Sequence, residues 1–76
     1  MKYGAVNIDN EILGGTPVFT GTRVPIQTLF DYLEGGDTME EFLDDFPSVT
    51  KDQSVQVLEM ARETISIEKV LNENFA

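Results

Sequence analysis

The sequence predicts a small, mainly α domain, in which a three-helix, helix-turn-helix-like unit follows a short N-terminal β-hairpin and arm. Three stretches after residue 25 repeat apolar residues at the spacing of amphipathic helices. Glycine pairs and prolines separate these stretches, and a Gly-centred turn precedes the first. Because 76 residues suffice for one domain and not for two, we expect a single domain with an arm (1–11), a Gly/Pro-rich hairpin (12–25) and the helical unit (26–76).

The first 25 residues carry turn and strand signals. The alternation around Val6 is weak and indicates at most one short edge strand in the arm. Residues 17–19 and 23–24 flank a three-residue connection, Thr20-Gly21-Thr22, whose central glycine is typical of a tight hairpin. We expect six residues to form the turns of this segment and to mark its ends: Gly14, Gly15, Pro17, Gly21, Thr22 and Pro25.

The first two helices are predicted from apolar spacing and from their end signals. Pro25 suits the first position of a helix, and this helix ends at Gly35-Gly36. A second helix over 37–46 begins with Asp37 or Thr38 as its N-cap, because each has a Glu three residues later. A proline directly after it prevents its continuation.

The third helix is longer and carries more apolar residues than one face can hold. It begins after Thr50, whose capping-box partner is Gln53, and runs from Lys51 to about Glu68 or as far as Asn74. One stripe consists of Val57, Leu58, Ala61 and Ile65, while Val55, Met60, Ile67, Val70 and Leu71 lie off it. The two shorter helices cover one side. The core of so short a chain is marginal. We therefore expect a homodimer, in which a second protomer covers the other side of this long helix.

Composition excludes several classes of function. Without cysteine the chain has no disulfide scaffold and no thiol catalysis, and without histidine it lacks the usual base at neutral pH and the usual zinc ligands. The N-terminus has no apolar signal segment, and no apolar run approaches the length that spans a membrane. We therefore expect a cytoplasmic, non-enzymatic protein with no cofactor, metal or small-molecule ligand and no membrane contact.

The negative charge is concentrated in the C-terminal half. Residues 37–76 contain ten acidic and three basic residues, a net charge of −7 out of −9 for the chain. This field repels polyphosphate and attracts basic surfaces. On the outward side of the second helix it comes from Glu40, Glu41, Asp44 and Asp45. These four residues form either a solvated face or a docking surface for a basic partner.

The helix over 37–46, a short break and the helix over 51–68 match a helix-turn-helix. In that motif the first polar residues of the second helix meet base edges. The candidates for DNA contact are Lys51, Gln53, Ser54 and Gln56. Lys51 is the only cation among them, whereas phosphate contacts are made mainly by Lys and Arg. The pattern therefore favours a helix pair used for packing or protein contact over one that binds DNA.

The string GGTPVFTGTRVP resembles the signature of domain-of-unknown-function family 433, a bacterial family associated with the antitoxins of toxin–antitoxin pairs. The resemblance covers roughly residues 8–65. The matching pieces are Asp9–Ile12, Gly14–Val18, Gly21–Pro25, Glu40–Pro47 and the helix after Thr50.

The resemblance implies an antitoxin that binds and blocks a PIN-like ribonuclease toxin and that represses its own operator as a complex. Many relatives carry Arg at the position of Thr20. The missing positive charge weakens the argument that the hairpin contacts DNA or an acidic toxin site. Two alternatives stay open. One is a stand-alone helix-turn-helix repressor, and the other is a dimerisation or adaptor module without a toxin.

Arg23 is the one cation between Lys2 and Lys51. One interpretation is an internal pair with Asp31, Glu34 or a helix C-terminal carbonyl, which would stabilise the corner before the first helix. The other follows from the resemblance: the guanidinium would reach the carboxylate-rich, metal-binding site of a nuclease toxin and clamp a carboxylate there with two parallel hydrogen bonds.

Overall fold

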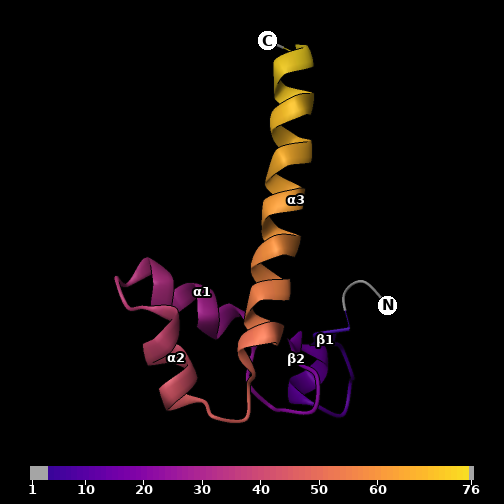
Figure 1. Ribbon diagram of the computed structural model, residues 1–76. Coiled ribbons are helices and arrows are strands. Elements are labelled where there is room, and N and C mark those ends of the chain that lie inside the picture. Colours follow the sequence, from indigo (N-terminus) through magenta and orange to yellow (C-terminus); the bar gives the residue numbers. More distant parts are fainter. Residues whose placement is uncertain (1–3, 76) are drawn as a thin grey trace.

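The computed structural model describes residues 4–75, and the side chains as far as Ile65 (Figure 1). In chain order the elements are strand β1, a 3-10 turn η1, strand β2 and helices α1 to α3. Their bounds are Val6–Asn7, Leu13–Gly15, Val18–Phe19, Ile26–Glu34, Met39–Asp45 and Lys51–Phe75. The predicted class, a mainly α domain with a short N-terminal antiparallel sheet, is confirmed.

The small sheet joins β2 to the arm, whereas the segment after the turn forms only one bridge with β2. Val6 pairs with Phe19, and Asn7 with Val18, in antiparallel register. On its other side β2 makes a single bridge, between Val18 and Pro25. Hydrogen bonds of 3.0 Å flank this bridge, from the Phe19 N–H to the Val24 carbonyl and from the Ile26 N–H to the Pro17 carbonyl. The predicted pairing ends there because α1 begins at Ile26. The hairpin connection itself is a tight turn, closed by a hydrogen bond of 3.0 Å from the Thr22 N–H to the Phe19 carbonyl.

Two of the predicted turn residues show why this segment needs glycine. Gly21 has a φ of +79°, a conformation that other L-residues rarely adopt. Gly15 has a φ of +91°, and a Cβ there would lie 3.0 Å from Oδ1 of Asn10. Thr22 completes the turn, since its hydroxyl donates to the Phe19 carbonyl at 2.8 Å and accepts from the Val24 N–H at 3.0 Å.

Capping groups set the beginnings of α2 and α3. The Thr38 hydroxyl oxygen accepts from the Glu41 N–H at 3.1 Å, so α2 begins at Met39. The predicted capping box of α3 is present in both directions. The Thr50 N–H donates to Oε1 of Gln53 at 3.0 Å, and the Gln53 N–H donates to the Thr50 hydroxyl oxygen at 3.1 Å.

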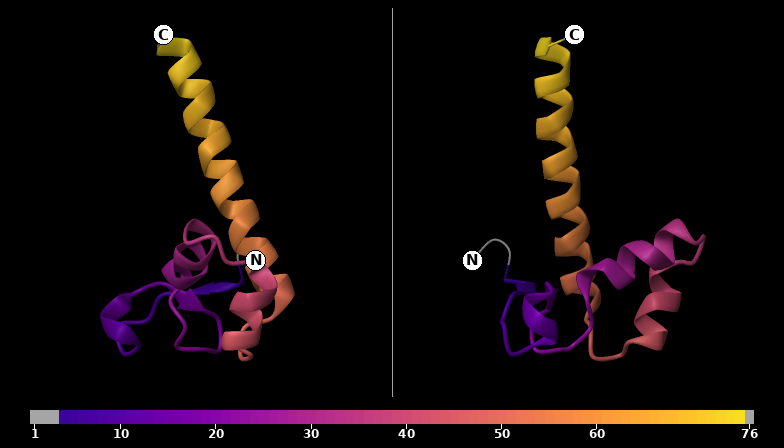
Figure 2. Two further views of the ribbon diagram at one scale, coloured as in Figure 1. Left: turned by 90° about the vertical axis from the view of Figure 1, so that its left-hand side faces the viewer. Right: turned by 180° about the vertical axis from the view of Figure 1, so that it is seen from behind.

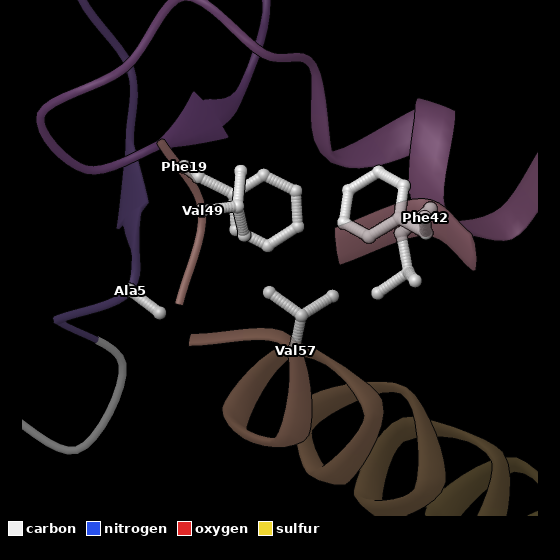
Figure 3. Packing of buried hydrophobic residues seen from close by; sticks show 6 residues of the cluster. Ala5, Phe19, Phe42, Val49 and Val57 are labelled. Carbon is white, nitrogen blue, oxygen red and sulfur yellow. The ribbon is translucent and has the colours of Figure 1, made fainter. Parts of the chain in front are cut away.

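Phe42 of α2 lies at the centre of the core. It is fully buried, and its ring centroid lies 5.8 Å from that of Phe19, 5.5 Å from that of Tyr32 and 5.3 Å from that of Phe46. Figure 3 shows the Phe19 and Phe42 rings side by side, with the side chains of Val49 and Val57 beside them. Elements from β2 to α3 therefore share one cluster, whose buried members are Ala5, Phe19, Leu29, Phe42, Val49 and Val57.

The upper part of α3 stands clear of this core. In Figures 1 and 2 the sheet, α1 and α2 gather around the first turns of α3, and the rest of the helix extends away in every view. Val57 is buried, whereas Ile65, two turns later, is 63% exposed. The side chains of Ile67, Val70 and Leu71, which the sequence places off the first stripe, lie outside the described residues.

Ser54 provides a test of this core. It is fully buried, and its hydroxyl has no hydrogen-bond partner among the described residues. Ser54→Ala removes an unpaired polar group and suits a helix better, so we expect it to raise the free energy of unfolding by about 1 kcal/mol in urea titrations. The exposed Ser48→Ala variant serves as the control. A stability below wild type for Ser54→Ala would contradict the packing described.

Candidate partner-binding site

An acidic face covers the outer side of α2. Between residues 34 and 45 the sequence contains six acidic residues and no base. All six are exposed, while Phe42 points inward from the same helix. The predicted candidates at 40, 41, 44 and 45 share one side because these positions recur at helical spacing. We define the acidic face as Glu34, Asp37, Glu40, Glu41, Asp44 and Asp45.

Tyr32 ties this face to the core, a role that the sequence analysis did not predict. Its hydroxyl donates a hydrogen bond of 2.6 Å to Oδ2 of Asp45. Its ring packs edge-on against Phe42 and Phe46, with centroids 5.5 Å and 5.8 Å away. The hydrogen bond to Asp45 raises the pKa of the Tyr32 hydroxyl above 10.0, with smaller contributions from desolvation and from the neighbouring carboxylates. Asp45 is thus a fixed member of the face.

Fewer side chains at the start of α3 are available to contact DNA than the sequence predicts. Ser54 faces the core, so the prediction that its hydroxyl contacts DNA is wrong. Both ends of the Gln53 amide are engaged, because Oε1 caps the helix and Nε2 donates to the Thr20 carbonyl at 2.9 Å. Lys51 remains exposed and Gln56 partly exposed. Of the four predicted DNA-contacting residues, these two have side chains open to a partner.

Gln53 links α3 to the turn that follows β2, and that turn is also held to the arm. The Thr20 hydroxyl donates to the Gly4 carbonyl at 2.6 Å, and the Thr20 N–H donates to the Ala5 carbonyl at 2.9 Å. The threonine at this position therefore fastens the arm, the turn and the start of α3 together. The helical spacing of the sequence gives no sign of this, because the contact joins residues 33 positions apart.

Arg23 is exposed on the same turn. Across the described residues, its guanidinium forms neither an ion pair nor a hydrogen bond, so the predicted internal pair with Asp31, Glu34 or a helix carbonyl is wrong. Asp31 instead accepts a hydrogen bond of 3.0 Å from Nε2 of Gln27, one turn earlier on α1, and Glu34 is exposed to solvent. The guanidinium is therefore free to contact a partner.

The described residues contain neither a metal-binding cluster nor a helix that could span a membrane. No group of three or more acidic side chains in that part of the chain is arranged to hold a metal ion. None of its helices combines the length and the apolar composition needed to cross a bilayer.

Comparison with known proteins places the sequence in one family. The model of a family described as "Protein of unknown function (DUF433)" matches residues 6–61, well over half of the chain. The match runs from β1 into α3 and includes the turn, the acidic face and the GGTP and GTRVP strings. Neither the curated proteins nor the solved structures contain a match to the chain.

The Tyr32–Asp45 bond predicts a pH dependence of stability. The pKa of the Tyr32 hydroxyl is raised in the folded state. The stability that the Tyr32–Asp45 bond contributes is therefore complete below pH 10 and is lost as the pH rises through the folded-state pKa. Wild type should therefore lose more stability than Tyr32→Phe as the pH is raised above about 10, measured by thermal unfolding. Asp45→Asn keeps the Tyr32 phenol but removes the carboxylate that it bonds. This variant should therefore lose less stability than wild type over the same rise in pH. Parallel curves for wild type and Tyr32→Phe would contradict this interpretation.

Proposed function

This chain belongs to the family of proteins of unknown function DUF433, and we propose that it is a non-catalytic binding protein, the antitoxin half of a toxin–antitoxin pair. The observation that carries the proposal is the acidic face: six exposed carboxylates within residues 34–45, with no base among them. A buried aromatic cluster and the Tyr32–Asp45 bond hold this face in place.

The chemistry of a ribonuclease explains why such a face would inhibit it. An enzyme that cleaves RNA presents Lys and Arg to the phosphates of its substrate. A preformed row of carboxylates on α2 competes for the same cations and is drawn to them over a distance by opposite charge. Inhibition then requires no reaction at the antitoxin, only occupation of the surface that binds RNA.

Arg23 offers a second contact of the opposite sign. Its guanidinium is exposed and unpaired within the described part of the chain. A PIN-like nuclease holds its metal with carboxylates, and Arg forms paired hydrogen bonds to a carboxylate. In this proposal Arg23 takes the place of the metal while the acidic face covers the surrounding cations.

The test first asks whether a short nuclease-like reading frame lies beside this gene. The product of such a frame is then co-expressed with the chain and assayed for RNA cleavage. The purified chain should inhibit that cleavage and bind less tightly as salt increases. We expect Glu40→Gln/Asp44→Asn to weaken binding about tenfold or more by calorimetry. The matched control, Glu11→Gln/Glu59→Gln, removes the same charge from exposed positions outside the face and should change binding by less than about threefold.

Arg23→Ala, with Arg62→Ala as its control, tests the second contact. Inhibition should weaken while the melting temperature stays at the wild-type value, and an equal loss of both would assign Arg23 to the fold alone. Failure to bind any neighbouring nuclease would overturn the antitoxin proposal. Specific binding of the chain alone to its upstream DNA, measured by fluorescence anisotropy at low salt, would support a repressor instead.

A further inference from the structure

An apolar groove lies between the arm, α1 and residues 57–64 of α3, and it uses none of the residues of the acidic face. Its volume is about 380 Å³. The uncharged residues that line it are Val6, Ile8, Pro17, Ile26, Phe30, Val57, Met60, Ala61 and Thr64. Ile8 is 66% exposed, and Ile65, one turn after Ala61 on α3, is 63% exposed. Exposed apolar residues gathered around a groove are typical of a site that binds another molecule.

The side chains of the groove offer no free hydrogen-bond donor. The one hydroxyl in the lining, that of Thr64, already donates to the Met60 carbonyl at 3.0 Å. Because the lining also lacks a cation, it has no group that binds a phosphate. An extended peptide in the groove would leave each buried carbonyl unpaired, at a cost of about 1–3 kcal/mol. The strand beside the groove, β1, has two residues and is too short to pair with a long added strand. An α-helix fits this lining best, because its backbone hydrogen bonds are internal.

Exposed acidic residues lie beside the groove. Asp9 directly follows Ile8 in the arm and is exposed. Asp31 of α1 is exposed as well, and it accepts a hydrogen bond of 3.0 Å from Nε2 of Gln27. Gln27 lines a smaller hollow that shares three of its lining residues with the groove. Both carboxylates therefore border the apolar surface.

The three cations whose side chains the structure describes lie away from the groove. Arg23 is on the turn that is bonded to Gln53, and Lys51 is the first residue of α3, so both precede the part of α3 that lines the groove. Arg62 lies two residues before Thr64. Two residues correspond to a rotation of about 200° around a helix, so Arg62 projects from the other side of α3. A partner at the groove therefore meets an apolar surface bordered by negative charge.

We propose that this groove binds an amphipathic α-helix of a basic partner protein. The apolar stripe of that helix packs against Ile8, Phe30 and Met60, and Lys or Arg on its flanks faces Asp9 and Asp31. A helix from a second copy of this chain fits less well, because each of α1, α2 and α3 contains more acidic than basic residues. The proposal goes beyond the proposed function, since it concerns a second surface and does not require the partner to be a nuclease.

The absence of tryptophan from the chain permits a direct test. The probe is a synthetic peptide of about 18 residues, or five helical turns, with Leu at helical spacing, one Trp within that stripe and Lys at the other positions. Its Trp emission should shift to shorter wavelength as the chain is added, with a Kd on the order of micromolar. One control peptide has the same composition with Leu and Lys alternating, and another has Glu in place of Lys. Each control should bind about tenfold more weakly or worse.

Lysine substitutions locate the binding surface. Ile8→Lys and Thr64→Lys each place a cation in the groove and should weaken binding of the basic helix about tenfold or more. Both positions are exposed, so the fold should persist, as circular dichroism would show. Val55→Lys is the matched control, because position 55 is also exposed and lies two residues before Val57, on the opposite side of α3. It should change binding by less than about threefold.

Three results would overturn the proposal. The first is a basic helix that leaves the Trp emission unshifted, or a control peptide that binds as tightly as the basic helix. The second is unchanged binding in both Ile8→Lys and Thr64→Lys. The third is sedimentation of wild type as a dimer that either of these variants dissociates, because the groove would then hold a second copy. No variant alters the acidic face and no measurement uses a nuclease, so the antitoxin proposal stands or falls separately.

Discussion

The burial of Phe42 positions α2. Its ring packs against aromatic rings from β2, from α1 and from the residue that ends α2. A helix of seven residues is too short to be stable alone in water, so α2 depends on this contact. The acidic side chains lie on the opposite side of the same short helix. One buried side chain therefore determines whether the face has a fixed shape.

The small size of the chain explains why its surface has both an exposed apolar part and an acidic part. A small domain buries a limited share of its apolar residues, and here the core ends near Val57, well before α3 does. Exposed apolar residues include Ile8 in the arm and Val55 and Ile65 on α3, whereas the acidic face lies on α2 and on the residues just before it. In the proposed function the acidic face serves a basic protein, because that association is electrostatic.

Features determined within a few residues of the chain were predicted well. The caps at Thr38 and Thr50 and the glycines after α1 gave helix bounds close to those observed. Contacts between distant segments were not predicted: the choice of β1 as the partner of β2, the Gln53–Thr20 bond and the Tyr32–Asp45 bond. The internal pair of Arg23 and the DNA contact of Ser54 were predicted wrongly, because a sequence does not show the direction in which a side chain leaves its element.

Amide hydrogen exchange of Phe42→Ala tests the dependence of α2 on its buried ring most directly. Losing a buried Phe costs about 3–5 kcal/mol, a large part of the stability of a small domain. In wild type the Phe42 and Phe46 N–H groups donate to the carbonyls of Thr38 and Phe42 at 3.1 Å and 2.9 Å. We expect the amides at positions 42 and 46 in the variant to exchange as fast as in an unstructured peptide. Protection equal to wild type at these two amides would contradict the account.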